Sequence, residues 1–196
     1  MKGSFGLIAV VVCGLVVPSI AQAQAPGDKP EGGAAGAPAG PPPPAPELDA
    51  FMKPFDGSWR CESKFFANAF GPGSPEMTGK STVKFKKELD GYFWKGEYDL
   101  KKSKTTPAMK AILYVGYDTG AKKFVITGLD SGGGFGTGVG TIEGETVTFL
   151  GEQTFGGKKI RTRESMGKSG PKAGFHKLEM DMGSGFVPFA EDTCKK

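Results

Sequence analysis

The sequence is poor in the residues that build metal and catalytic centres. It contains one histidine, His176, in 196 residues, and its three cysteines do not cluster with it. Asp and Glu are scattered singly, so the ligand spacing of a metal site is absent. There is no Gly-x-Ser-x-Gly segment that would place a serine nucleophile on a sharp turn. The sequence therefore gives no indication of an enzyme and predicts neither a metal nor a cofactor.

Long hydrophobic runs are lacking except at the N-terminus. Lys2 precedes an apolar run, 5–17, of about a dozen residues, which is too short to span a bilayer. Ala21-Gln22-Ala23 then provides a small-residue cleavage pattern, so residues 1–23 are predicted to be a signal peptide. Cys13 leaves with this segment, and it lacks the small preceding residue of a lipidation site. The mature protein is expected to be exported, periplasmic or secreted, without a transmembrane segment.

Large apolar residues are missing from 24–46, which consists almost wholly of Pro, Ala and Gly. Such a segment cannot bury enough surface to offset the entropy lost on ordering. We predict a disordered linker, partly in the polyproline-II conformation, ahead of one domain at 47–196. A recognition segment for a proline-binding partner is the alternative, and a plain spacer is favoured.

Neither sign of charge is in large excess. The formal net charge is +4, and the short lysine pairs lie beside acidic residues. Proteins that bind nucleic acid gather their basic residues on one face. No nucleic-acid partner is predicted.

Two cysteines remain outside the signal peptide, Cys61 and Cys194. In an exported chain, two cysteines indicate one disulfide. Two unpaired buried thiols are the alternative. A bridge between them would join the first predicted strand to the last.

No sustained helical period occurs after residue 55, and only 47–55 can form one or two helical turns. From Trp59 to Phe65, alternate residues including Ser63 share one face, which is the period of a half-buried antiparallel strand. Similar runs between turn residues predict an all-β chain of about nine or ten strands in meander order, as a barrel or a sandwich. The runs span 59–65, 82–89, 92–100, 111–117, 123–129, 146–152, 159–166, 175–182 and 186–194.

Two glycine-containing segments have local consequences. Asp90-Gly91 predicts a two-residue hairpin turn, because both positions tolerate positive φ. The glycine-rich run 132–140 has the composition of a nucleotide loop, but no helix is predicted after it and Gly-Lys-Ser/Thr is absent. A strand that bends sharply, or that lets a neighbour pack close, explains this run better.

Several segments together resemble a known family. They are Gly57-Ser58-Trp59-Arg60-Cys61, Leu89-Asp90-Gly91-Tyr92-Phe93, Gly116-Tyr117-Asp118, Lys122-Lys123-Phe124, Asp130-Ser131-Gly132-Gly133 and Glu191-Asp192-Thr193-Cys194-Lys195-Lys196. The Gly-x-Trp element resembles the calycin motif found in lipocalins, and the whole set resembles an uncharacterised bacterial family, domain of unknown function 1579. The resemblance implies an up-and-down antiparallel β-barrel with its first strand beside its last, and no known reaction. Lipocalins stack an arginine from beyond the last strand on this tryptophan, whereas this chain has only lysines there.

His176 shares a strand face with Met180, so it is expected to point into the barrel. Related barrels, the nitrobindins, bind haem through a histidine near the end of the last strand, and the last strand here has none. We therefore favour an interior histidine that is hydrogen-bonded to a neighbour, and haem binding through His176 is a lesser alternative.

The aromatic interior either fills the barrel or lines a cavity. We predict an exported, non-enzymatic barrel that binds a small apolar ligand in its interior. A structural or interaction module of the cell envelope without a ligand is the alternative. Trp59 is expected to close one end of the barrel over residues 51–55 and not to touch a ligand. The predicted cavity residues are Phe85, Tyr92, Trp94, Tyr98, Phe149, His176 and Met180.

Overall fold

A computed structural model describes residues 40–196 of the chain. The predicted signal peptide, 1–23, and most of the predicted linker, 24–46, lie outside the described residues. Residues Pro42–Lys196 form one compact unit, and its first helix begins at Pro46. The hydroxyl of Tyr92 donates a hydrogen bond to the carbonyl of Pro42, so the chain just ahead of the helix already contacts the barrel.

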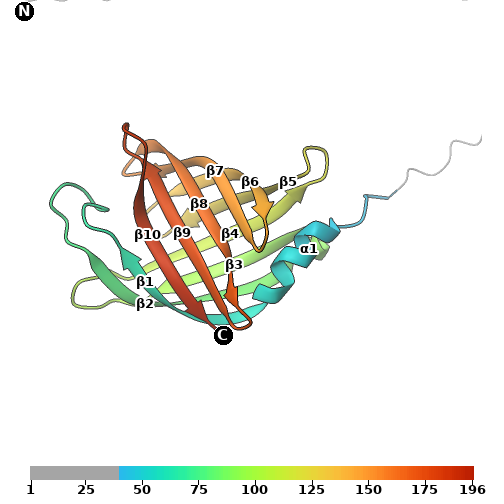
Figure 1. The fold of residues 1–196 in the computed structure, drawn as a ribbon, viewed down its shortest axis with the longest axis horizontal. Coiled ribbons are helices and arrows are strands. Elements are labelled where there is room, and N and C mark those ends of the chain that lie inside the picture. The colour runs from blue at the N-terminus through green and yellow to red at the C-terminus, as the bar shows by residue number, and fades with distance from the viewer. Residues whose placement is uncertain (1–39) are drawn as a thin grey trace, which may run out of the picture. The chain divides into compact units, whose positions relative to one another are not determined.

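Ten antiparallel strands follow one another around a closed barrel (Figure 1). Each strand pairs with its neighbours in sequence, and β10 returns to pair with β1. The predicted fold class, an up-and-down barrel of about ten strands with a short N-terminal helical turn, is confirmed. The strands are β1 (Gly57–Phe65), β2 (Met77–Glu88), β3 (Phe93–Leu100), β4 (Met109–Asp118), β5 (Lys123–Asp130), β6 (Phe135–Glu143), β7 (Thr146–Phe155), β8 (Lys158–Gly170), β9 (Ala173–Asp181) and β10 (Phe186–Lys195).

The barrel is closed where the first and last strands meet. Cys61 on β1 lies directly opposite Cys194 on β10, and the two form a disulfide with their Cα atoms 4.0 Å apart. Antiparallel pairing then places Ser63, two residues after Cys61, opposite Asp192, two residues before Cys194. The covalent link therefore holds the register in which these two polar side chains meet.

A short helix plugs one end of the barrel. The helix α1 (Pro46–Met52) and the 3₁₀ turn η1 (Lys53–Phe55) bury Leu48, Phe51, Met52 and Phe55. A helix of seven residues is too short to be stable alone, so packing on the barrel must hold it in place. The Phe51 ring packs on Phe124 of β5 with a centroid distance of 5.3 Å, and the Phe55 ring packs on Trp59 at 5.9 Å.

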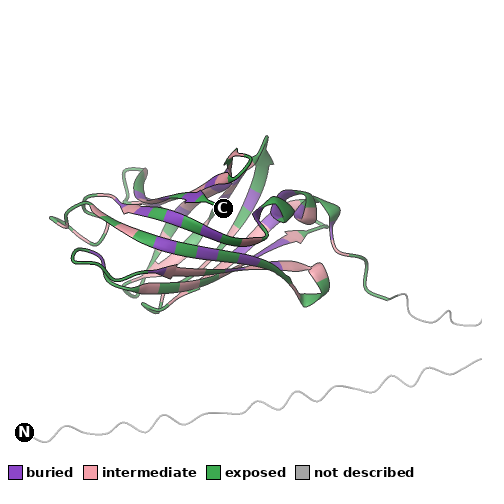
Figure 2. Cartoon of the chain, turned by 90° about the horizontal axis from the view of Figure 1, so that it is seen from below, coloured by how far each residue is buried: buried purple, intermediate pink, exposed green. Residues whose placement is uncertain are grey.

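Burial alternates along the strands, as Figure 2 shows for the barrel wall. On β1 the inward residues, from Trp59 to Phe65, are buried and the residues between them are exposed or half-buried. Residues 135–140 of the glycine-rich run lie in β6, as a strand was expected there, and they pair with both β5 and β7. None of the helices in residues 40–196 is long and apolar enough to cross a membrane.

The turn between β2 and β3 differs from the predicted two-residue hairpin. It forms the 3₁₀ turn η2 (Leu89–Gly91), in which Leu89, Asp90 and Gly91 all have positive φ. Because the turn is longer, β3 begins at Phe93 rather than at Tyr92. Tyr92 therefore lies outside the strand, although the inward face of Trp94 and Tyr98 is the predicted one.

Candidate functional site

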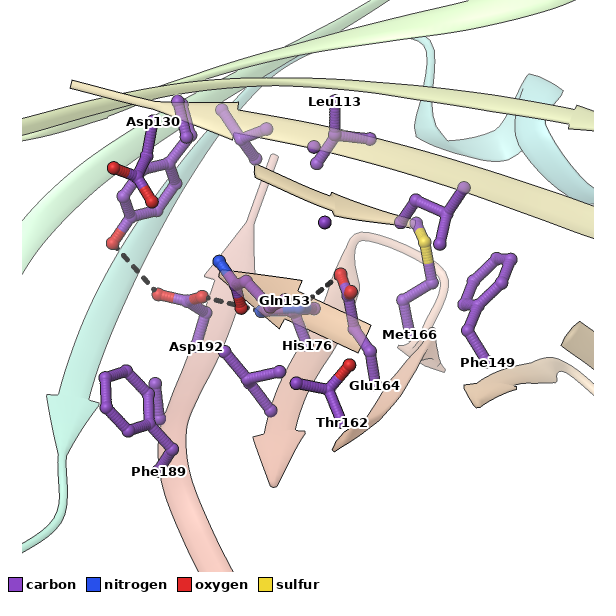
Figure 3. A pocket seen from close by; sticks show the side chains of 18 of the residues that line it. Leu113, Asp130, Phe149, Gln153, Thr162, Glu164, Met166, His176, Phe189 and Asp192 are labelled. Carbon is purple, nitrogen blue, oxygen red and sulfur yellow. Dashed lines mark hydrogen bonds and ion pairs between the residues drawn. The ribbon is translucent and has the colours of Figure 1, made fainter. Parts of the chain in front are cut away.

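A cavity of about 220 Å³ lies inside the barrel. It extends from Phe55 and Trp59, beside the helical plug, to Phe70 and Phe189 at the opposite end. Most of its lining is apolar, which suits a small apolar molecule. Figure 3 shows the side chains around its centre.

Four inward-facing glycines line this cavity. Gly128 on β5, Gly136 and Gly138 on β6, and Gly151 on β7 all line it. At Gly128 a Cβ atom would meet no heavy atom within 4 Å. At Gly136, Gly138 and Gly151 a Cβ atom would lie within 3.3 Å of a neighbouring atom, so Gly128 is the one of these four glycines that leaves open space.

A row of polar residues crosses the opposite wall. Strand register places Ser63 opposite Asp192, and Asp192 opposite His176 on β9. The Ser63 hydroxyl donates to Asp192 Oδ1 at 2.5 Å, and its oxygen lies 2.8 Å from Ser81 Oγ and 2.9 Å from the Tyr98 hydroxyl. Since a serine has one proton to donate, Ser81 and Tyr98 must donate to Ser63. Every hydroxyl in this row has a partner.

His176 lies between two carboxylates. Its Nδ1 is 3.0 Å from Asp192 Oδ2, and its Nε2 is 2.9 Å from Glu164 Oε1 on β8, as the dashed lines in Figure 3 show. A carboxylate can only accept hydrogen bonds, so the two contacts require one proton beyond those of a neutral imidazole and two carboxylates. Two negative groups share one positive group, and the cluster carries one net negative charge.

The protonation of this cluster follows from its surroundings. Burial of the imidazole lowers its pKa, but the hydrogen bonds and charges of Asp192 and Glu164 outweigh burial and raise the pKa of His176 to about 10. Burial, together with the charge of Asp192, raises the pKa of Tyr98 to about 12. At neutral pH the cluster therefore holds an imidazolium and a neutral phenol.

The raised pKa of His176 predicts a loss of stability at alkaline pH. The folded pKa exceeds the unfolded value of about 6.5, so the contribution is full below that pH and is lost as pH rises through about 10. We expect the free energy of unfolding to fall between these values by at most about 1.4 kcal/mol per pH unit from this group. Urea unfolding of wild type and His176→Gln at a series of pH values measures the effect.

The comparison of the two proteins isolates His176 from the lysines and tyrosines that titrate in the same range. The groups that face it are Glu164 from β8 and Asp192 from β10, with Tyr98 of β3 beside Asp192. At neutral pH the variant should be less stable by about 3 kcal/mol, the low end for breaking a buried ion pair, because the His176 side chain is 30% exposed to the cavity. The two stability curves should converge toward pH 10, and parallel curves would contradict the assignment.

Five of the seven predicted cavity residues lie together around this space. They are Phe85, Tyr98, Phe149, His176 and Met180. Trp59 also lines the cavity while it packs on Phe55, and its Nε1 donates to the Phe55 carbonyl at 2.6 Å.

Trp94 and Tyr92 are not among the lining residues, contrary to the prediction. Trp94 is fully buried in the core beneath the helical plug. Tyr92 lies beyond the start of β3, where its hydroxyl bonds to Pro42. Because the β2–β3 turn is longer than predicted, Tyr92 lies outside the strand and away from the cavity.

The partners of His176 are not among the residues predicted from the sequence. Ser63 was placed on the inner face, but Asp192, Glu164, Thr162 and Gln153 were not singled out, and all four line the cavity. A usable signal existed for Asp192: a bridge between Cys61 and Cys194 fixes a register in which residues 63 and 192 are opposite. No comparable signal points to Glu164.

The geometry does not suit haem or a serine nucleophile. Both ring nitrogens of His176 are held by carboxylates, so neither offers a lone pair to iron while these hydrogen bonds persist. For the same reason His176 cannot accept a proton from a hydroxyl, and Ser63 bonds to Asp192 instead. Within residues 40–196, no group of three His, Cys, Asp or Glu side chains is arranged to hold a metal ion.

One of the solved structures similar to this chain shares its fold. The crystal structure of Rv2717c from M. tuberculosis is 12% identical, with a TM-score of 0.57 over 78% of this chain and 98% of that one. A redesigned β-barrel, b11L5F_LGL, is 10% identical, with a TM-score of 0.40 over 74% of this chain and 94% of that one. At such identities the likeness to Rv2717c concerns the fold alone. No curated protein matches the chain.

One family model matches, that of "Protein of unknown function (DUF1579)", over residues 46–167. The match runs from the helical plug through most of β8 and includes Glu164. His176 and Asp192, on β9 and β10, lie beyond it. Because the match covers more than half of the chain, this protein belongs to the DUF1579 family of proteins of unknown function.

Proposed function

We propose that this protein is exported and that its barrel binds a small, mainly apolar molecule in the interior cavity, without enzymatic activity. The observation that carries the proposal is the open space at Gly128, on the inner face of the barrel wall. A glycine inside a strand weakens the sheet, because it has no side chain to pack and loses more entropy on folding. Glycine at such a position needs a reason.

Two other glycines of the barrel have an evident packing reason. A Cβ atom at Gly96 would lie 2.8 Å from the Phe85 ring, and one at Gly116 would lie 2.5 Å from the Phe93 ring. At both positions a neighbouring aromatic side chain occupies the space. At Gly128 no side chain occupies this space. An alanine or a larger residue there would fill the void and stabilise the barrel, so stability alone does not explain the glycine. A ligand that enters this space accounts for the glycine.

The disulfide supports export. Disulfides form and persist in oxidising compartments, and Cys61–Cys194 is buried between the first and last strands. The predicted signal peptide, 1–23, and linker, 24–46, fit a barrel domain at 47–196 that is tethered or released outside the cytoplasm. The periplasm and the extracellular space are equally compatible with these features.

A binding role is favoured over catalysis by the state of the interior polar groups. His176 is bonded at both nitrogens and is protonated, so it cannot serve as a general base. Tyr98 has a raised pKa and remains a phenol. Neither group is thus in a state to accept a proton from a substrate, and the cluster presents fixed charges to the cavity.

The substitution Gly128→Leu tests the proposal by filling the cavity from its wall. We expect wild type to enhance the fluorescence of the uncharged probe N-phenyl-1-naphthylamine, and Gly128→Leu to raise the Kd of the probe by about tenfold or more. The matched control is Thr127→Leu, which adds the same side chain to the neighbouring position on the outer face of β5. The control should bind the probe as wild type does.

Two results would contradict ligand binding in the cavity. One is that wild type takes up no probe, and the other is that Gly128→Leu and wild type bind the probe equally. The first would favour a ligand-free interaction module of the cell envelope. One observation favours that second candidate: the outer face of β5–β7 exposes four large apolar side chains, Leu129, Phe135, Val139 and Leu150.

A further inference from the structure

The charge inside the barrel constrains the head group of a ligand. The two carboxylates around His176 are compensated by a single imidazolium, so one negative charge remains on the wall of the cavity. The lining residues include no lysine or arginine, and they include two further carboxylates, Asp130 and Glu152. A buried charge is costly unless an opposite charge or several hydrogen bonds meet it.

We propose that the molecule bound in this cavity is an amphiphilic cation, an apolar group carrying one protonated amine, whose ammonium binds beside Glu164. The inference rests on the proposed function, because it names the ligand class of the same cavity. In this complex the ammonium compensates the excess negative charge of the cluster. The hydrocarbon part of the ligand contacts the apolar remainder of the lining.

Spare hydrogen-bond acceptors lie where the ammonium would bind. Glu164 uses Oε1 for His176, and its other oxygen, Oε2, has no protein partner among residues 40–196. Thr162, on the same inner face of β8, is only 7% exposed, and its hydroxyl also lacks a protein partner within the described residues. The side-chain amide of Gln153 on β7 is the third such group in the described part of the chain, and Figure 3 labels these three side chains and His176 among those that line the cavity.

These acceptors match an ammonium in number and charge. An ammonium has three N–H donors and no acceptor, so a carboxylate oxygen, a hydroxyl oxygen and an amide oxygen can each receive one. By contrast, both oxygens of Asp192 are already engaged, one by His176 and the other by Ser63. Of the two carboxylates around His176, Glu164 is therefore the one that remains able to bind a ligand.

The same arrangement disfavours anionic ligands. The one positive group, His176, has both of its N–H donors committed to carboxylates. A fatty carboxylate would meet the net negative charge with no free cationic donor, and in a cavity of low dielectric this repulsion is strong. The apolar neighbours of the cluster, Phe149, Met166 and Phe189, suit an alkyl or aromatic group in either case.

The test compares three eight-carbon ligands that differ only in the head group: octylamine, octanol and octanoate. At about pH 7.5 the amine is protonated and the acid is ionised. Each displaces N-phenyl-1-naphthylamine from the full mature protein, and the displacement curves give the three Kd values. We expect octylamine to bind about tenfold more tightly than octanol and roughly a hundredfold more tightly than octanoate.

Glu164→Gln removes the charge with little change in size, and the amide oxygen can still accept from His176. In this variant the preference for octylamine over octanol should fall about tenfold. The matched control, Glu143→Gln, makes the same change at an exposed position of β6, and it should keep the wild-type preference.

The outcomes separate this inference from the proposed function. If the probe binds but octanol or octanoate competes as well as octylamine, or if none of the three competes, the cavity binds ligands and the amine assignment is wrong. An unchanged preference in Glu164→Gln also overturns the assignment. If neither the probe nor any octyl compound binds, the proposed function itself fails.

Discussion

Removing the disulfide, as Cys61→Ala with Cys194→Ala, is expected to lower the free energy of unfolding by about 3–5 kcal/mol. The bridge joins residues separated by 133 positions, and for a loop of that length the chain-entropy estimate is about 5 kcal/mol. Alanine is the suitable replacement because both cysteines are buried, and serine would add a buried hydroxyl. Urea unfolding at neutral pH measures the difference.

Reduction provides a control without mutation. Wild type unfolded in the presence of a reductant should follow the curve of the double variant, and the reductant should not shift the curve of the variant. The pairing of β1 with β10 persists in both states if the strand hydrogen bonds suffice to close the barrel. If the free energy of unfolding fell by less than about 1 kcal/mol, the bridge would not constrain the unfolded chain as the chain-entropy estimate requires.

The inner face of the barrel could be predicted where strands alternate regularly. The pattern of β1 places Trp59 and Ser63 inside, and the pattern of β9 does the same for His176. These predictions need only the period of two, which does not depend on the neighbouring strands. The outward direction of Glu97, Asp99, Glu179 and Asp181 follows from the same rule.

Contacts between strands can be predicted only when the register of strand pairing is known. The sequence does not determine that register where a strand contains an irregularity. A register shift between Pro188 and Ala190 separates the β9–β10 turn from the contact of His176 with Asp192. Without that shift, residue 191 would oppose His176, and Asp192 would not. A second shift, between Lys168 and Gly170, separates the β8–β9 turn from Glu164. Turn residues alone therefore could not predict the pairs that His176 makes.

The order of the glycines in β6 carries information about the cavity wall that the amino-acid composition alone does not give. Gly136, Gly138 and Gly140 alternate with larger residues, so one face of β6 lacks side chains from residue 136 to residue 140. Period-two alternation shows that the bare face is continuous, but it does not show which face points inward. The large residues of the other face, Phe135 and Val139, are exposed, and Gly136 and Gly138 line the interior. Deciding between these two orientations required the packing of β5 and β7.

Trp59 is the other position where a large loss of stability is expected. Trp59→Ala should lower the free energy of unfolding by about 3–5 kcal/mol, because truncation of a buried aromatic residue leaves a large void. The ring is 2% exposed, packs on Phe55, and lies 5.6 Å from the Lys196 ammonium. Lys196 thus lies over the tryptophan, where the resemblance to lipocalins implies an arginine.

A matched pair of milder variants separates the hydrogen bond of Trp59 from its volume. Trp59→Phe removes the Nε1 donor and leaves the Phe55 carbonyl without its partner. Trp94→Phe makes the same change at an equally buried tryptophan whose Nε1 has no partner in the described part of the chain. An unmade hydrogen bond to a buried group costs about 1–3 kcal/mol, so Trp59→Phe should be the more destabilising by about that amount in urea unfolding. Equal losses at the two positions would show that the bond to Phe55 does not hold the plug, and that packing alone closes this end of the barrel.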